Sequence, residues 1–223
     1  MLIEIFADLI CPWCYIGKRR LDRALELRPQ ARAEIRWLPY QLNPEMPVGG
    51  MDRAQYLATK FGGGERARLV QSSIRQAAAQ DGLELKLERI ARTPNTLDAH
   101  RLVRQAERQG LGTAVAMALF QAYFEQGRDF GRRDVLLEVA EACGLSRREV
   151  AAGLDGGADV LAIRTADHQA RQLGVQAVPC FIFNRRYALS GAQEPGSFLP
   201  LIELAEAESL TEAVTEPLVR ASA

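Results

Sequence analysis

Two cysteines near the beginning of the sequence form the motif Cys11-Pro12-Trp13-Cys14. A pair with this spacing is typical either of a dithiol that exchanges disulfides or of one half of a zinc site. In disulfide exchange, one thiolate attacks a disulfide and a second thiol resolves the mixed disulfide that results. The elements around the motif, and the other cysteines and histidines, decide which chemistry the chain favours.

The sequence around the motif places it at the start of a helix. A short apolar strand, residues 2–6, precedes it, and apolar residues recur at helical spacing after it until Pro29. With Cys11 at the N-cap and Pro12 in the first helical position, unpaired amides and the helix dipole stabilise a thiolate at Cys11. Cys14 lies one turn further on the same face. We therefore expect an exposed nucleophilic thiolate at Cys11 and a more buried resolving thiol at Cys14.

The remaining cysteines and histidines do not complete a zinc site. Structural zinc takes four Cys or His ligands at short paired spacings, whereas Cys143, Cys180, His100 and His168 are scattered singly along the chain. We therefore predict no metal and a redox role for the pair. Cys143, at a helix end, and Cys180, after a proline at a strand start, are expected to be buried packing thiols.

The composition excludes several classes of protein. A chain of 223 residues buries about 70% of its unfolded surface, so its core needs no disulfide or metal. Its 28 basic and 28 acidic residues cancel, which removes the positive charge expected of a protein that binds nucleic acid or anionic membranes. Four cysteines are too few for a disulfide scaffold. No glycine-rich phosphate loop is present, so no nucleotide cofactor is indicated.

The first ten residues are mostly apolar but lack the features of a secretory signal. Glu4 and Asp8 interrupt them, no basic segment precedes them, and no small-residue cleavage site follows. No apolar run approaches the roughly 20 residues of a membrane span. We therefore expect a cytoplasmic protein, in which a CxxC pair is catalytic or metal-binding rather than structural.

The predicted elements follow the order β-α-β, a helical block, then α-β-β-α. Because strands lie at both ends of the chain, we expect the ends to share one sheet and the helical block to form a second subdomain. Ser146 and Glu149 form a capping box within that block. The other elements are a strand at 35–38, a loop at 39–50, helices over 51–174, strands at 178–183 and 187–189, a turn at 185–186 and a helix from Pro195.

Taken in order, these motifs resemble those of the DsbA family of thioredoxin-fold proteins, most closely its FrnE-like cytoplasmic subgroup. The resemblance covers nearly the whole chain except the acidic tail. The matching segments are Cys11-Pro12-Trp13-Cys14, Trp37-Leu38-Pro39-Tyr40-Gln41-Leu42-Asn43-Pro44, Asn95-Thr96, Ala99-His100-Arg101-Leu102, Val178-Pro179 and Ser190-Gly191-Ala192-Gln193.

The resemblance implies an α/β protein with a thioredoxin-like fold and an inserted all-helical subdomain. The thioredoxin-like domain comprises residues 1–40 and 160–207, the insertion residues 41–159 and a C-terminal tail residues 208–223. The resemblance also implies that Pro179 is cis and faces the CxxC pair, with the Val178 backbone turned toward an extended substrate.

The residues expected around the two cysteines divide into three groups. Pro12, Trp13, Val178 and Pro179 are expected to support the active site. Asn43 and His100 are candidate cleft residues, although a structural role for His100 fits equally well. The basic run Lys18-Arg19-Arg20 is expected to be a solvated helix face.

The resemblance implies a thiol–disulfide oxidoreductase without a cofactor. Its partners would be protein or small-molecule thiols and disulfides, with glutathione one candidate, and neither nucleic acid nor membrane. Because the indole of Trp13 carries no charge, we expect a weakly stabilised Cys11 thiolate and a potential near the reducing end of the family's range.

Two alternatives remain open. One is a glutathione-dependent isomerase or transferase, of the 2-hydroxychromene-2-carboxylate isomerase or kappa type. Those enzymes typically have serine at the first position of the motif, and the transferases have an acidic residue where this chain has Gly191-Ala192-Gln193. The other is a redox-inert binding or chaperone module with a groove in the helical subdomain.

Overall fold

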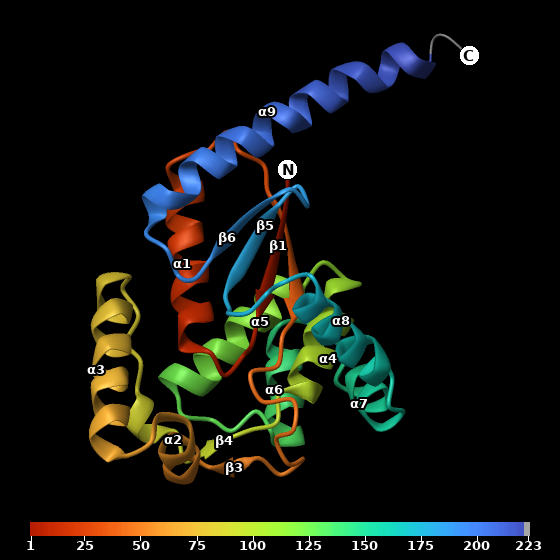
Figure 1. Ribbon diagram of the computed structural model, residues 1–223. Coiled ribbons are helices and arrows are strands. Elements are labelled where there is room, and N and C mark those ends of the chain that lie inside the picture. The colour runs from red at the N-terminus through yellow and green to blue at the C-terminus, as the bar shows by residue number, and fades with distance from the viewer. Residues whose placement is uncertain (221–223) are drawn as a thin grey trace.

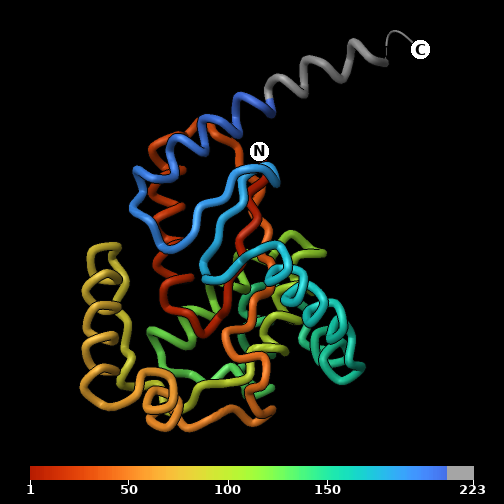
Figure 2. The backbone as a smooth tube through the Cα atoms, viewed as in Figure 1, coloured from red at the N-terminus to blue at the C-terminus, as the bar shows by residue number. Residues whose placement is uncertain are grey.

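Both ends of the chain contribute to one four-stranded sheet in the computed structural model, which describes residues 1–220 and the side chains of residues 1–209 (Figure 1). The strand order is β2-β1-β5-β6. β1 (Leu2–Ala7) and β2 (Glu34–Pro39) are parallel, while β5 (Cys180–Phe183) and β6 (Tyr187–Ser190) complete the sheet in antiparallel fashion. Figure 2 shows the first strand beside the late hairpin. The expected sharing of one sheet is confirmed.

β1 lies at the centre of this sheet because its side chains are buried. Ile3 and Ile5 are fully buried, and Ile5 lies opposite Trp37 on one neighbour and Phe181 on the other. Parallel pairing of β1 with β2 requires a crossover between them, which α1 (Pro12–Glu26) provides. The carboxyl end of β1 therefore leads into the helix that begins with the cysteine motif.

Helices cover both faces of the sheet. α1 packs against α9 (Pro195–Arg220) on one side, while α4 (Leu97–Glu107) and α8 (Val160–Gln172) contact β2 on the other (Figure 1). α9 begins at Pro195, as predicted, and continues to Arg220, into the segment that we expected to be a tail. Residues 221–223 of that expected tail lie outside the described residues.

The rest of the chain between β2 and α8 is mainly helical, as predicted. The N-cap of α7 is confirmed, because the Ser146 side chain accepts a hydrogen bond from the Glu149 amide. β3 (Met51–Asp52) and β4 (Arg92–Thr93) form a small antiparallel ladder that was not predicted, because a strand of two residues is too short to show alternation of apolar and polar residues. The other elements are α2 (Arg53–Phe61), α3 (Gly64–Gln80), η1 (Leu87–Arg89), α5 (Gly112–Phe120), a π-helix (Gln121–Glu125), α6 (Arg133–Ala142) and α7 (Arg147–Asp155).

An aromatic cluster joins α1 to the helical insertion. The Tyr15 ring stacks on Phe120 with centroids 5.3 Å apart and on Phe124 at 6.4 Å. The Tyr15 hydroxyl donates to Glu125 Oε1 at 2.5 Å. Since Tyr15 follows Cys14 directly, the insertion fixes the orientation of the helix that carries the motif.

The basic run after the motif is not a solvated face, in contrast to our expectation. Lys18 and Arg20 are buried, and Arg20 Nε donates to Asp81 Oδ2 at 2.6 Å. Arg20 Nη1 also donates to the carbonyl oxygen of Ala192 at 2.8 Å. Lys18 pairs with Asp22 within α1, whereas Arg20 packs α1 against its neighbours, and these partners satisfy both charges. No helix within residues 1–220 has the length and hydropathy of a membrane span.

Candidate active site

The cysteine motif occupies the first turn of α1. Cys11 is the N-cap residue with extended backbone angles, and Pro12 follows in the first turn. The Cys11 amide donates to the carbonyl oxygen of Asp8 at 2.9 Å, and the Cys14 amide donates to that of Cys11 at 3.1 Å. Both cysteines are free thiols. The turn places the two thiols together at the end of the central strand.

The two thiols differ in burial. Cys14 is fully buried, Cys11 is 5% exposed and Trp13 is half-buried. Cys11 is thus the more accessible thiol, as expected, although it is far less exposed than we predicted. Burial raises the pKa of Cys14 well above the ordinary thiol value, and its hydrogen bond with Cys11 raises it further. Cys14 therefore needs help to lose its proton.

The Val178–Pro179 peptide lies directly against this turn. It is cis, which confirms what the resemblance implied. The Cys11 thiol donates to the carbonyl oxygen of Val178 at 3.7 Å. Gly17 allows the close approach of α1, since a Cβ there would lie 2.8 Å from Pro179 Cγ. The two cysteines and the two residues at the start of β5 are therefore brought together.

A buried carboxylate, which the sequence analysis did not select, lies behind the motif. Asp8 is fully buried, and its Oδ2 accepts a hydrogen bond from the Leu42 amide at 2.6 Å. Its Oδ1 faces Nε2 of His100 at 3.5 Å, and the charge of Asp8 also raises the pKa of Cys14. The sequence signal that could have identified Asp8 is an acidic residue in the otherwise apolar run between the first strand and the motif. His100 is thus adjacent to the site, through Asp8.

The candidate cleft residue Asn43 points toward α2. Its side-chain amide donates to the Tyr56 hydroxyl at 3.3 Å. The loop that carries it is anchored just before Asn43, where the Gln41 amide donates to Asp167 Oδ1 at 2.7 Å and Arg171 donates to the Gln41 carbonyl at 2.6 Å. The hydrogen bond to Tyr56 holds the Asn43 side chain against α2 rather than against the cysteines, so its role in the site stays a prediction.

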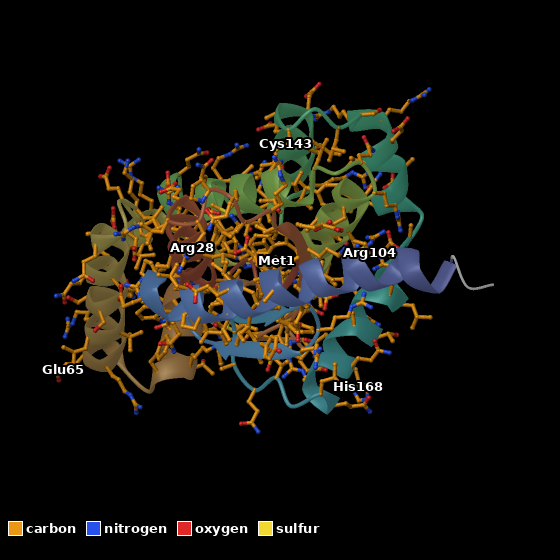
Figure 3. The ribbon with its side chains drawn as sticks, turned by 90° about the horizontal axis from the view of Figure 1, so that it is seen from above. Met1, Arg28, Glu65, Arg104, Cys143 and His168 are labelled. Atoms are coloured by element: carbon orange, nitrogen blue, oxygen red, sulfur yellow. The ribbon has the colours of Figure 1, made fainter. Side chains whose placement is uncertain are left out.

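The other two cysteines and the second histidine lie on elements other than α1, with Cys180 directly after Pro179. Cys180 is buried in β5, where burial raises its pKa, and burial also raises the pKa of half-buried Cys143. Cys143 follows the end of α6, and His168 lies on α8 (Figure 3). Among the side chains that the structure describes, those of residues 1–209, no three of His, Cys, Asp or Glu gather into a metal site.

A cavity of about 440 Å³ lies between β2, α4 and α8. Its walls are largely apolar, with His100 and Leu9 among the residues that line it. Of its charged residues, Arg36 pairs with Glu34, Arg104 and Arg108 pair with Asp159, and Glu107 accepts a hydrogen bond from the Trp37 amide. His100, which faces Asp8 behind the motif, also lines the cavity, so the cavity lies on that side of the motif.

Comparison with known proteins places this geometry in a family. The family model described as DSBA-like thioredoxin domain matches residues 2–203. The chain is similar to a probable DsbA oxidoreductase, SCO1869 from Streptomyces coelicolor, with 30% identity and a TM-score of 0.83 over 93% of this chain and 91% of that one.

Two further solved structures share the fold at lower identity. One is a 2-hydroxychromene-2-carboxylate isomerase, at 15% identity and a TM-score of 0.67, over 96% of this chain and 98% of that one. The other is the cytosolic disulfide reductase DsbM from Pseudomonas aeruginosa, at 20% identity and a TM-score of 0.65, over 96% and 100%.

Proposed function

Because the chain belongs to the DSBA-like thioredoxin domain family, we propose that it is a thiol–disulfide oxidoreductase with Cys11 as nucleophile and Cys14 as resolving thiol. The observation that carries the proposal is the position of Cys11. It caps α1, its sulfur faces the Val178 carbonyl at 3.7 Å, and Cys14 lies fully buried behind it. This arrangement presents one thiol to a partner and shields the other until the mixed disulfide forms.

The exchange proceeds in two balanced steps. The Cys11 thiolate attacks a partner disulfide, forms a mixed disulfide and releases the first partner thiolate. Cys14 then loses its proton and attacks Cys11 Sγ, so that the Cys11–Cys14 disulfide forms and the second partner thiol leaves. In this proposal, Pro12 and Trp13 shape the turn, while Val178 and Pro179 hold the partner's backbone beside Cys11.

The remaining parts of the proposal concern partners and setting. The substrates are protein or small-molecule thiols and disulfides, with glutathione one candidate, and no cofactor takes part. We assign the chain to the FrnE-like subgroup and to the cytoplasm; DsbM, which shares the fold, is a cytosolic disulfide reductase. We keep the division into a thioredoxin-like domain (1–40 and 160–207), an insertion (41–159) and a tail (208–223) as part of the proposal.

A glutathione-dependent isomerase is the second candidate, since the isomerase structure shares the fold and a largely apolar cavity lies behind the motif. Two cysteines in the motif favour the oxidoreductase, because an isomerase needs no resolving thiol. An isomerase would convert an aromatic substrate only with glutathione, and its activity would survive Cys14→Ser. A binding module would show neither activity.

The test of the proposal is reduction of insulin disulfides by the protein with a thiol reductant. Cys11→Ser should abolish the activity, and Cys14→Ser should trap a mixed disulfide whose partner mass spectrometry identifies. Cys143→Ser is the matched control, because this half-buried thiol lies at the end of α6, away from α1, and its replacement should leave the activity unchanged. Full activity in Cys11→Ser would contradict the proposal.

A further inference from the structure

We propose that α2 and α3 form a docking surface for an acidic segment of the polypeptide whose disulfide reacts at Cys11. This assignment rests on the proposed function and deepens it, because it names the class of substrate that the site takes. The two helices lie within residues 53–80, which we call the basic lobe.

The first observation is the charge of the basic lobe. Its one acidic residue is Glu65, and its five basic residues are Arg53, Lys60, Arg66, Arg68 and Arg75. The lobe therefore has a net charge of +4, although the whole chain has a formal charge of zero. Counting Asp52, which caps α2, the net charge is still +3, and Asp81 after α3 is buried against Arg20. The lobe is thus a local positive surface on a protein that is neutral as a whole.

The second observation is that these positive charges are not neutralised within the protein. None of the five basic side chains forms an ion pair with a side chain that the structure describes, whereas most basic residues elsewhere have an acidic partner. Arg53 and Lys60 lie over the uncharged ring of Tyr56, at 5.5 Å and 5.4 Å from its centroid. The other three basic side chains are exposed. Because no internal carboxylate pairs with them, they are available to the carboxylates of a partner.

The third observation is the position of the lobe relative to the motif. α3 packs against α1, and Asp81 accepts hydrogen bonds from Arg20 and Arg23 of α1. In Figure 1, α2 and the first half of α3 extend past the start of α1, the end that carries Cys11. This end of α1 also carries the positive end of the helix dipole. A polypeptide whose disulfide lies at Cys11 can therefore reach the lobe with the residues that flank its cysteine.

A further unpaired cation lies on α1 itself. Arg19 is half-buried and forms no ion pair with a described side chain, and its Nε is buried without a hydrogen-bond partner there. It lies about two turns after Cys11 in the same helix. An arginine that is partly buried is usually paired, so this one adds to the positive charge that a partner meets. Unpaired charge is thus present on the helix of the motif as well as on the lobe.

The spacing of the arginines fits an extended acidic segment. Arg68 and Arg75 lie seven residues apart on α3, which puts them on one face of the helix and about 10 Å apart along its axis. An extended chain advances about 3.4 Å per residue, so two carboxylates three residues apart span the same distance. A polypeptide is the occupant that this position favours, because the neighbouring motif needs a partner with a disulfide.

The test measures the attack of Cys11 on two matched synthetic peptides, with the reduced full-length protein. Each peptide has one cysteine in a disulfide with 5-thio-2-nitrobenzoate. Beside that cysteine, one peptide has two glutamates three residues apart and the other has two glutamines. The Cys11 thiolate attacks the peptide sulfur, forms a mixed disulfide with the peptide and releases the coloured nitrobenzoate thiolate. At low peptide concentration, the rate of release reports binding and attack together.

We expect the glutamate peptide to react about tenfold faster than the glutamine peptide at low ionic strength, the lower end of the range for electrostatic steering. Salt should reduce this ratio of rates, because it screens exposed charges. In the triple variant Arg66→Gln/Arg68→Gln/Arg75→Gln, the ratio should fall severalfold toward one. A merely structural role of these arginines would change both rates alike and leave the ratio as it is in the wild type.

The matched control is the triple variant Arg32→Gln/Arg148→Gln/Arg164→Gln, which removes the same charge. These arginines are also exposed and form no ion pair with a described side chain, but they lie before β2, on α7 and on α8. This variant should keep the wild-type ratio. If both triple variants lose the ratio, the rates respond to net charge alone and the docking surface is overturned.

Other outcomes also decide between the possible occupants. The docking surface is overturned if the wild-type protein reacts equally with both peptides, or if the lobe variant keeps the wild-type ratio. With oxidised glutathione, the lobe variant should lose less of its rate than with the glutamate peptide; an equal loss would assign the arginines to small anions. A short single-stranded oligonucleotide that binds the wild type but not the lobe variant, with a peptide ratio of one, would assign them to nucleic acid. If neither peptide reacts faster with the wild type than with Cys11→Ser, the proposed function itself fails.

Discussion

The sulfur of Cys11 lies 3.7 Å from the carbonyl oxygen of Val178, a residue 167 positions later in the chain. Cys11 is fixed by the end of β1 and the start of α1, while Val178 is fixed by the start of β5. The two meet because β5 pairs with β1 in the same sheet. The candidate site therefore exists only when both ends of the chain have closed the sheet.

The contact between α1 and Pro179 gives the first prediction. In Gly17→Ala, the new Cβ would lie 2.8 Å from Pro179 Cγ and 3.2 Å from the Phe181 ring. The Val178–Pro179 segment must then move away from Cys11. We expect a destabilisation of about 1–3 kcal/mol, typical of overpacking, and a loss of disulfide reductase activity larger than the loss of folded protein. Denaturant unfolding and insulin reduction measure the two effects.

Gly196→Ala is the control for that substitution. Gly196 lies in the first part of α9, and a Cβ there meets nothing within 4 Å. Alanine is the better helix former, so stability should stay equal or rise slightly, with full activity. If Gly17→Ala were as active and stable as Gly196→Ala, the close packing of α1 on Pro179 would be wrong.

Local sequence signals were sufficient for most of the fold and for the centre of the site. Cys11 and Pro12 marked the start of α1, Ser146 and Glu149 marked that of α7, and Pro195 marked that of α9. Each is a helix terminus whose backbone chemistry involves neighbours in sequence. Such signals need no knowledge of tertiary structure, and the structure places these elements as predicted.

What the sequence could not show depends on pairs that are distant in the chain. Asp8 and His100 look like an isolated acid and an isolated histidine until β1 and α4 pack together. From the sequence, the charge of Arg20 predicts a solvent-exposed side chain. In the structure, Asp81 at the end of α3 forms an ion pair with Arg20, and this pairing allows Arg20 to be buried. Whether a charged side chain lies on the surface or in the core depends on its partner, and that partner is known only from the tertiary structure.

The raised pKa of Cys14 leads to the second prediction. Ultraviolet absorbance reports thiolate formation, and the difference between Cys11→Ser and the double variant Cys11→Ser/Cys14→Ser isolates the titration of Cys14. Because burial is the largest cause of the shift and Cys11 a smaller one, Cys14 should still titrate above about 8.5, the value of a free thiol. Titration at or below that value would show that burial does not control this thiol.

The third prediction concerns stability in alkali. Burial raises the pKa of Tyr123 to about 12, from 10 in water. A group whose pKa is raised by folding contributes stability that is fully present below the unfolded pKa and is lost as pH rises through the folded one. The free energy of unfolding should therefore fall between about pH 10 and 12, and should fall less in Tyr123→Phe.

At neutral pH, Tyr123→Phe measures how much one hydrogen bond contributes to the free energy of unfolding. The Tyr123 hydroxyl donates to the carbonyl oxygen of Arg92 at 3.0 Å, so Tyr123→Phe should cost about 1 kcal/mol. The gap between the two proteins should then narrow as pH rises above about 10. Urea unfolding at a series of pH values measures it, and a gap that stays constant to pH 12 would contradict the assigned cause.

The buried ion pair between Arg20 and Asp81 gives the last prediction. Asp81 accepts hydrogen bonds from Arg20 Nε at 2.6 Å and from Arg23 Nη1 at 2.8 Å, and its side chain is almost fully buried. Asp81→Ala removes the buried carboxylate of Arg20 and leaves only the exposed Glu194, whose Oε1 lies 2.8 Å from Arg20 Nη1, so the cost should approach the roughly 3–5 kcal/mol of a broken buried ion pair. Glu141→Ala, which removes an exposed partner of Arg147, should leave the unfolding midpoint nearly unchanged.

The position of Arg20 extends that prediction from stability to activity. Arg20 also holds the carbonyl oxygen of Ala192, and Ala192 packs beside Gly17, next to Pro179. Arg20→Met keeps much of the apolar stem but releases both Asp81 and this loop. We expect insulin reduction by Arg20→Met to fall severalfold in samples that remain folded. If activity persists while stability falls, the ion pair anchors the insertion alone and does not position the residues around Cys11.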